Sequence, residues 1–270
     1  MNPTTRNQLL DLSRAFYEAH AEAFDASRGH QPWPGWARLL PALPALPRLE
    51  PDAEPGADTK TAPRRLRVLD IGCGNARFAR FLHDAGVALD YKGLDANAAL
   101  LDAARERLPE ELQDAVELEE HDFLAGEAPG AELPPGPFDL IVLMGVLHHV
   151  PGADWRQALL EASAARLAPG GILALAAWQF GGRPRFEKRT VAWESLGEIL
   201  GSPVDLSTLE PGDTLLRFGD VPFAPPRYCH QVAEGEFMGW PEALDLEGLD
   251  EYRADGSEGD LNRYWVLRRT

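Results

Sequence analysis

The sequence predicts an α/β fold built on a mostly parallel sheet, and three observations lead to this prediction. Short β-rich runs alternate with helical segments from Arg67 to Trp178. A glycine-rich turn, IGCGN, directly follows the first of these runs. Two further runs, FDLIVLM and GILALAAW, are almost wholly apolar, which is typical of strands buried on both faces. A chain of 270 residues can bury one such core and also carry a covering insertion.

Before this α/β region, residues 1–50 are expected to form a helical cap. Apolar side chains recur at helical spacing between Asn7 and Leu40, which predicts one or two helices. The stretch Pro41–Pro63 is rich in proline, alanine and acidic residues and has no sustained pattern. It predicts a linker loop over residues 51–64.

The main domain is expected to span residues 65–270. Its predicted strands are Arg67–Ile71, Asp90–Asp95, Val116–Glu119, Phe138–Met144 and Gly171–Trp178, and its predicted helices are Ala76–Ala85, Ala98–Leu108 and Trp155–Leu167. A Pro169-Gly170-Gly171 turn is expected to separate the last helix from the last strand. Residues 179–226 predict an irregular insertion that covers the active-site face as a lid, with one helix at Val191–Leu200. The tail predicts a helix at Gly235–Leu244 and a hairpin of two strands, Leu246–Ala254 and Arg263–Arg269.

Composition narrows the class of protein. Hydrophobic residues make up 44% and charged residues 26%, no apolar run is long enough to span a bilayer, and the first residues resemble no signal peptide. With two cysteines, we expect a reducing, cytoplasmic setting. The net charge of −17 repels a phosphate backbone, so we expect no DNA and no membrane partner. The same charge disfavours an RNA substrate without excluding it.

The glycine-rich turn predicts a ligand site at Asp70, Gly72, Gly74 and Asn75. Its glycines let backbone N–H groups approach a ligand closely. The third glycine of a dinucleotide site is replaced by Arg77, which is too bulky for a pyrophosphate. A carboxylate at Asp70 suits a cationic amino-acid group better than a phosphate.

Three later strand ends add to this site. Asp95, followed by Ala96, ends a strand where a carboxylate can accept both hydroxyls of a ribose. Asp122 is a candidate acceptor for the exocyclic amine of adenine, and Phe123 is a candidate to pack on its ring. The strand Phe138–Met144 delivers Gly145 and two histidines to the carboxyl edge of the sheet.

These four signals, in this order and spacing, resemble the class I methyltransferase family over Leu66–Trp178, including the LAPGG turn. The resemblance implies a Rossmann-like, seven-stranded sheet whose last strands form an antiparallel hairpin. It also implies S-adenosylmethionine as the cofactor and S-adenosylhomocysteine as its product. The cofactor-binding residues expected on this basis are Tyr17, Asp70, Gly72, Gly74, Asn75, Asp95, Ala96, Asp122, Phe123, Met144 and Gly145.

A narrower resemblance runs outside the core. The segments FYEAHAEAFDASRGHQPWP, AAWQF, EPGDTLLRF, RYCHQVAEGEF and NRYWVLRR are similar to the eukaryotic wobble-uridine tRNA methyltransferases. Those enzymes methylate the carboxylate of 5-carboxymethyluridine. The chain departs from them at Phe180 and Cys229, and in its acidic tail. The implied partner is tRNA or a small carboxylate-bearing molecule, with a basic activating subunit as a further possible partner for so acidic a chain.

An acceptor pocket is predicted from a second group of residues, namely Arg28, Trp33, Arg227, Tyr228 and His230. Arginine side chains match a carboxylate in shape and charge. The alternative interpretation places Trp33 in the core and the arginines in surface ion pairs. Tyr17 is expected to cover the cofactor or pack on the core rather than to catalyse. The arginines between Arg183 and Arg189 form either a basic patch or a solvated loop.

The two adjacent histidines carry the remaining prediction. On one strand end they would point to opposite faces, so we expect no shared metal ion. We expect one to pack inward and His148 to face the acceptor, where it would be the base for a hydroxyl or amine. The leading function is methyl transfer to a carboxylate or other oxygen on tRNA. A small-molecule O- or N-methyltransferase and an inactive cofactor-binding scaffold remain the alternatives.

Overall fold

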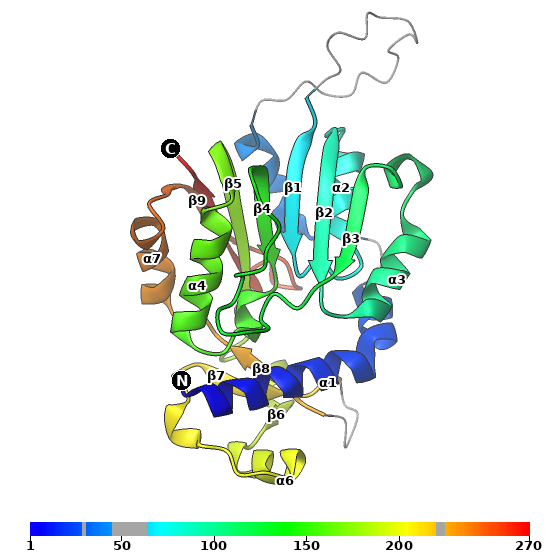
Figure 1. Cartoon of the computed structure of the whole chain (residues 1–270). Coiled ribbons are helices and arrows are strands. Elements are labelled where there is room, and N and C mark those ends of the chain that lie inside the picture. Colours follow the sequence, from blue (N-terminus) through cyan, green and yellow to red (C-terminus); the bar gives the residue numbers. More distant parts are fainter. Residues whose placement is uncertain (29–30, 45–63, 220–224) are drawn as a thin grey trace, which may run out of the picture.

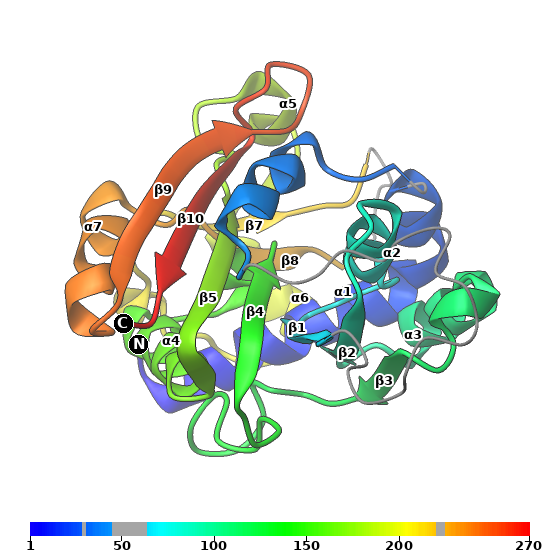
Figure 2. The same ribbon diagram turned by 90° about the horizontal axis from the view of Figure 1, so that it is seen from above.

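A seven-stranded sheet of order β3-β2-β1-β4-β5-β10-β9 forms the centre of the computed structural model, which describes residues 1–28, 31–44, 64–219 and 225–270 (Figures 1 and 2). Its strands are β1 (Leu66–Ile71), β2 (Leu89–Asp95), β3 (Val116–Glu120), β4 (Phe138–Met144), β5 (Leu167–Trp178), β9 (Glu247–Ala254) and β10 (Asn262–Arg268). Neighbouring strands run parallel from β3 to β5, whereas β10 is antiparallel to both β5 and β9. The predicted Rossmann-like sheet with a C-terminal hairpin is therefore confirmed.

The helices connect these strands and cover both faces of the sheet. The α-helices are α1 (Pro3–Arg28), α2 (Arg77–Asp84), α3 (Ala98–Arg107), α4 (Ala153–Ala164), α5 (Pro184–Glu187), α6 (Leu196–Leu200) and α7 (Glu234–Ala243). Short 3₁₀ helices are η1 (Pro34–Ala42), η2 (Glu110–Leu112), η3 (Leu147–His149), η4 (Trp193–Ser195) and η5 (Leu206–Thr208). Within the described ranges, none of the helices combines the length and apolar character needed to cross a bilayer.

Alternation along the central strands divides the core into two layers. In β4, Ile141 and Leu143 face the layer that contains α4 and α7, while Leu140 and Val142 face the layer that contains η1 and α2. Successive strand residues point to opposite faces, so a strand covered on both sides must be apolar throughout. The continuous runs in β4 and β5 are explained by this double burial.

The chain reverses its direction of strand addition between β1 and β4. From β1, the sheet extends through β2 and β3 on one side and through β4 and β5 on the other. In open α/β sheets, ligands bind at this switch point, beyond the carboxyl ends of the strands. The loops after β1 and β4 both start there.

A second, three-stranded antiparallel sheet lies beyond these carboxyl ends, next to α1 (Figure 1). Its strands are β6 (Thr190–Val191), β7 (Asp213–Leu216) and β8 (Arg227–His230), in the order β6-β7-β8. Leu9 and Leu12 of α1 pack with Leu215 and Tyr228 in one apolar cluster. α1 and the small sheet together therefore form a roof over the switch point.

Two sequence predictions about local structure are wrong. The predicted helix Val191–Leu200 is reduced to η4 and α6, because residues before it pair with β7 as β6. The Pro169-Gly170-Gly171 segment lies within β5 as an irregularity, where the β4–β5 register shifts and Gly170 has a φ of +74°. The predicted helix Trp155–Leu167 accordingly ends earlier, at Ala164. The proposed linker falls almost wholly outside the described residues.

Candidate functional site

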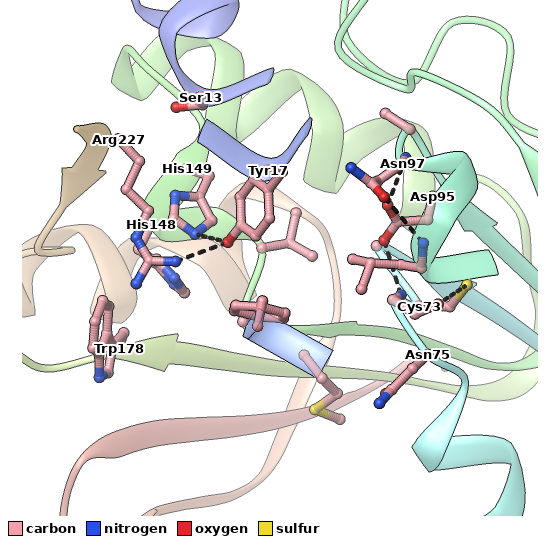
Figure 3. A pocket seen from close by; sticks show the side chains of 18 of the residues that line it. Ser13, Tyr17, Cys73, Asn75, Asp95, Asn97, His148, His149, Trp178 and Arg227 are labelled. Carbon is pink, nitrogen blue, oxygen red and sulfur yellow. Dashed lines mark hydrogen bonds between the residues drawn. The ribbon is translucent and has the colours of Figure 1, made fainter. Parts of the chain in front are cut away.

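A cavity of about 1360 Å³ occupies the space between the carboxyl ends of the parallel strands and the roof. It exceeds the roughly 300–1,000 Å³ of a typical single-ligand pocket. Figure 3 shows two groups of labelled side chains in it, with Asp95, Asn97, Cys73 and Asn75 on one side and Tyr17, His149, Arg227 and Trp178 on the other. The cavity has room for two ligands placed side by side.

Asp70 lies at the end of the cavity formed by the glycine turn, and its pKa is strongly raised. Its side chain is 2% exposed, and the hydroxyl of Tyr91 donates a hydrogen bond to Oδ2. Burial, with a smaller effect from the nearby charge of Asp95, raises the pKa of Asp70 to about 7, although the Tyr91 hydrogen bond opposes this. Oδ1 has no hydrogen-bond partner within the described part of the chain. A buried carboxylate oxygen without a donor fits a cationic ligand group.

The glycine turn is held in a shape that few side chains would allow. Gly72 has a φ of +76°, and a Cβ atom there would lie 2.5 Å from Cγ2 of Val146 and 3.7 Å from Cζ of Phe123. Gly74 also has a positive φ, but a Cβ there would meet open space. Gly72 is therefore required for close packing and Gly74 for backbone conformation.

Asp95 braces this turn from the next strand. Its Oδ2 accepts a hydrogen bond from the backbone N–H of Gly74 at 2.8 Å, and its Oδ1 accepts one from Asn97 at 2.9 Å. Burial raises the pKa of Asp95, although these two hydrogen bonds oppose the shift. Each carboxylate oxygen keeps a further lone pair for a ribose hydroxyl. Ala96 lines the cavity beside it.

Asp122 and Phe123 also line the cavity. Asp122 forms an ion pair with Arg14 of α1 at 2.6 Å and accepts the N–H of Leu124 at 3.0 Å. On the opposite side, Nδ2 of Asn75 donates to Asp25 of α1 at 2.8 Å. α1 thus closes over this end through two polar contacts that the sequence analysis did not foresee.

At the other end, Arg227 lies buried among aromatic rings. It is 5% exposed, and its guanidinium carbon lies 4.8 Å from the ring centroid of Phe16 and 5.1 Å from that of Trp178. Nη1 donates to the hydroxyl of Tyr17 at 3.0 Å. Nε is buried without a partner, and no carboxylate of the described residues forms an ion pair with Arg227. A buried, uncompensated guanidinium is a strong site for an anion.

His149 continues the hydrogen-bond chain from Tyr17. Its Nδ1 lies 3.0 Å from the carbonyl oxygen of Tyr228, and its Nε2 lies 2.8 Å from the Tyr17 hydroxyl. A carbonyl oxygen only accepts, so Nδ1 carries the proton and Nε2 accepts from Tyr17. The proton order therefore runs from Arg227 through Tyr17 to His149.

The expectation that the two histidines diverge is wrong. Both lie in η3 rather than on a strand end, both line the cavity, and their ring centroids are 4.1 Å apart. His148 is buried and contacts Trp178. Met144, Gly145 and Trp33 also line the cavity, and Trp33 in addition packs against the core layer of η1 and α2.

Tyr228 and His230 do not line this cavity, contrary to the sequence prediction. The Tyr228 side chain is fully buried, and its hydroxyl donates to Oδ1 of Asp213 at 2.6 Å. His230 is 2% exposed and contacts the same oxygen through Nδ1 at 2.7 Å. Alternation along β8 places Arg227 on the cavity side and these two residues elsewhere. The side chain of Arg28, at the end of α1, lies outside the described residues.

Two carboxylates near His230 form ion pairs with the buried side chain of Arg156. Arg156 is 1% exposed and donates to Glu236 at 2.6 Å and to Glu210 at 2.8 Å. Ligand atoms of Glu210, Asp213 and His230 lie within 4.8 Å of one another, a spacing compatible with a metal ion. Arg156 already supplies the positive charge there. This group therefore joins α4 and α7 to the small sheet.

Comparisons with known proteins concern the sequence and the fold of the chain. Residues 69–173 match the family model described as a methyltransferase domain. A trans-aconitate 2-methyltransferase of Variovorax paradoxus is 37% identical over 42% of this chain and 39% of its own length. A mouse tRNA (carboxymethyluridine(34)-5-O)-methyltransferase is 28% identical over 60% of this chain and 19% of its own length. The chain thus matches well under half of the length of these curated relatives.

Solved structures share the fold at low identity. A SAM-dependent methyltransferase of Methanosarcina mazei has a TM-score of 0.53 at 18% identity, covering 76% of this chain and 92% of its own. One from Mesorhizobium loti has a TM-score of 0.53 at 19% identity, covering 87% and 97%. Residues 69–173 are therefore similar to a methyltransferase domain, and the chain has the fold of these two S-adenosylmethionine-dependent methyltransferases. The predicted enzyme class and cofactor are both supported.

Proposed function

We propose that this protein transfers a methyl group from S-adenosylmethionine to a carboxylate oxygen of an acceptor held by Arg227. The observation that carries this proposal is the buried guanidinium of Arg227, which has no carboxylate partner in the described ranges and lines the same cavity as Asp70 and Asp95. The acidic end of the cavity, at Asp70 and Asp95, matches a cationic cofactor. The basic end, at Arg227, matches an anionic acceptor.

The residues of the first end fit the cofactor. Asp70, through its unpartnered Oδ1, would bind the ammonium group, and the N–H groups of the glycine turn would lie along the amino-acid part. Asp95 would accept the ribose hydroxyls. Asp122 and Phe123 would bind the adenine edge and face. This assignment keeps the cofactor-binding roles predicted from the sequence.

Methyl transfer from a sulfonium requires little of the protein beyond alignment of the two reactants. When bound, S-adenosylmethionine supplies a methyl group on a sulfonium, which is an excellent leaving group. An acceptor carboxylate arrives ionised, so no base is needed; a C–O bond forms, the C–S bond breaks, and a methyl ester and S-adenosylhomocysteine result. Arg227 orients the carboxylate, and the aromatic wall of Phe16 and Trp178 excludes water.

A second candidate function rests on the Tyr17–His149 hydrogen bond. If the acceptor is a hydroxyl or an amine, a proton must leave during transfer. The Tyr17 oxygen can take that proton while its own passes to Nε2 of His149, 2.8 Å away. This assigns the base to the Tyr17–His149 pair instead of His148.

The two relatives provide two candidate classes of acceptor molecule. The names of both enzymes reported above denote carboxylate-bearing acceptors, one a small acid and the other a tRNA nucleoside. A tRNA acceptor is the main proposal from the sequence, and a net charge of −17 supports the added proposal of a basic activating subunit. A small polycarboxylic acid is the alternative and needs no such subunit.

Methyl-labelled S-adenosylmethionine tests these proposals directly. The protein is incubated with total tRNA, and separately with trans-aconitate. Label that mild base removes from either product supports carboxylate methylation and names its carrier. Base-stable label supports the hydroxyl or amine alternative. Absence of cofactor binding by calorimetry contradicts the proposed function, and binding without transfer even with an activating subunit points to a scaffold.

A further inference from the structure

Three arginines that form no ion pair with any described residue line the cavity. Arg185 lies in α5, Arg189 precedes β6, and Arg217 follows β7; all three line the cavity. Across the described residues, no carboxylate forms an ion pair with any of them. Nothing in the assignment of the cofactor or of the reacting carboxylate uses these side chains.

Arg189 and Arg217 lie opposite one another in the small sheet. β6 and β7 are antiparallel with Thr190 opposite Leu216, so Arg189 and Arg217 form the next pair. The backbone N–H of Arg217 donates to the carbonyl of Arg189 at 3.0 Å, which continues the pairing. Like charges directly opposite across a strand pair destabilise the fold.

This repulsion is unusual in so acidic a chain. The protein has 43 acidic against 26 basic residues, and neighbouring arginines do find partners. Arg183 pairs with Glu258 at 3.0 Å and with Asp260 at 2.7 Å, and Arg14 pairs with Asp122 on the cofactor side. Among the described residues that line the cavity, Arg185, Arg189, Arg217 and Arg227 form no ion pair, and they lie on the side away from the glycine turn.

We propose that Arg189 and Arg217, with Arg185 beside them, bind a second anionic group of the acceptor. This deepens the proposed function, because it makes the acceptor a polyanion whose reacting carboxylate lies at Arg227. The chemistry is that of a phosphoryl or carboxylate group held by arginine forks. The ligand's charge removes the repulsion between Arg189 and Arg217.

Arg217 follows the last residue of β7, so strand alternation does not fix the direction of its side chain; it lines the same cavity as Arg227, which brings both anion sites within reach of one molecule. Arg227 lies opposite Leu216, so Arg217 lies one residue further along the neighbouring strand. Adjacent strands are about 4.8 Å apart, and one residue advances about 3.4 Å along a strand. Arg227 is buried, whereas Arg217 is exposed, so the acceptor would enter with its reacting carboxylate first.

The test uses inorganic pyrophosphate and citrate as probes, titrated calorimetrically at constant ionic strength into the full chain. The double variant Arg189→Gln/Arg217→Gln is compared with Arg253→Gln, which changes an exposed arginine on β9 that does not line the cavity. We expect the native chain and Arg253→Gln to bind one or both probes equally and the double variant to bind at least tenfold more weakly. Preference for pyrophosphate assigns a phosphoryl group, and preference for citrate assigns a carboxylate.

Two results overturn the proposal, namely equal affinities in the double variant and Arg253→Gln, or no binding of either probe to the native chain. S-adenosylmethionine is titrated into the same samples. Its binding is expected to be the same in all three proteins, which shows that the double variant is folded. If the native chain does not bind S-adenosylmethionine, the proposed function is contradicted, independently of the results with pyrophosphate and citrate.

Discussion

The guanidinium of Arg227 donates a hydrogen bond to the hydroxyl of Tyr17 at 3.0 Å and so joins β8 to α1, 210 residues apart in the chain. Tyr17 in turn hydrogen-bonds to His149 of η3 at 2.8 Å. Three separate parts of the chain therefore fix the orientation of one buried cation. This contact assembles the acceptor end only when α1 and the small sheet are both in place.

Replacing Arg227 with glutamine is expected to affect the acceptor much more than the cofactor. The change removes the charge from a buried anion site, so kcat/KM for the acceptor should fall about 100-fold or more, in keeping with the loss of a charge-assisted pair. Calorimetric affinity for S-adenosylmethionine should change less than threefold. A comparable loss of affinity for S-adenosylmethionine would contradict the assignment of Arg227 to the acceptor site.

Substituting phenylalanine for Tyr17 distinguishes the two acceptor chemistries. The ring packing is kept, but the hydroxyl between Arg227 and His149 is lost. For a carboxylate acceptor we expect kcat to fall less than about tenfold with an unchanged pH profile, because no proton is removed. A fall of about 100-fold or more, with a changed pH profile, would favour a hydroxyl or amine acceptor.

Cofactor affinity is expected to rise with pH through the titration of Asp70. Burial raises the pKa of this carboxyl to about 7, so it is largely protonated at pH 6 and largely ionised at pH 8. A cationic ligand binds the ionised form, and affinity for S-adenosylmethionine should increase about tenfold between these pH values. Calorimetry at both pH values measures the effect, and a flat profile would place the ammonium group elsewhere.

The variant Asp70→Asn serves as its control and carries a stability prediction. The pKa of Asp70 is higher in the folded than in the unfolded chain, so its contribution to stability falls as pH rises from about 4 to about 7. Asparagine avoids this cost, and the variant should be more stable than the native chain at pH 8 by on the order of 2 kcal/mol. It should lose cofactor binding at both pH values. Chemical denaturation at pH 5 and pH 8 provides the measurement.

Removal of the Asp95 side chain is expected to abolish cofactor binding. Asp95→Ala removes the ribose acceptor and also the brace on the Gly74 N–H, so affinity should fall about 100-fold or more. Asp102→Ala is a matched control, because Asp102 is exposed on α3 and pairs with nearby Arg105. Unaltered affinity in Asp95→Ala would contradict the site assignment.

His230 is expected to stabilise the fold in a pH-dependent way. Burial lowers the pKa of His230, but the hydrogen bond with Asp213 and the nearby carboxylate of Glu236 outweigh it and the net shift is upward. A raised pKa in the folded state means that the contribution is complete below about pH 6.5 and is lost as pH rises through the folded-state value. His230→Gln should therefore lower the free energy of unfolding by about 1–2 kcal/mol at pH 6 and by less at pH 9. His83→Gln, at a surface pair, should show a smaller and flatter difference.

The cofactor end of the site could be predicted from the sequence because its geometry is local. Asp70 is the next-to-last residue of β1 and Asp95 ends β2, and parallel strands bring their carboxyl ends to the same edge. The acceptor end could not be predicted in the same way. Tyr228 and His230 were assigned to it together with Arg227, yet alternation along β8 turns them toward Asp213.

The small sheet shows why such assignments need tertiary structure. Its strands are two to four residues long and lie in a glycine- and proline-rich segment, so no periodicity identifies them. Their pairing depends on packing against α1, more than 160 residues away. The opposed pair Arg189 and Arg217 exists only in that register.

The sequence by itself determined the parallel sheet, the terminal hairpin and the placement of Asp70 and Asp95 at one edge of the sheet. These features follow from hydrophobic periodicity and from glycines at positive φ, which act over a few residues. Only the tertiary structure decided which face of β8 borders the cavity, which histidine meets Tyr17, and which arginines remain unpaired. Those outcomes depend on the packing of distant segments, because a buried charge is compensated by whatever the folded chain brings next to it.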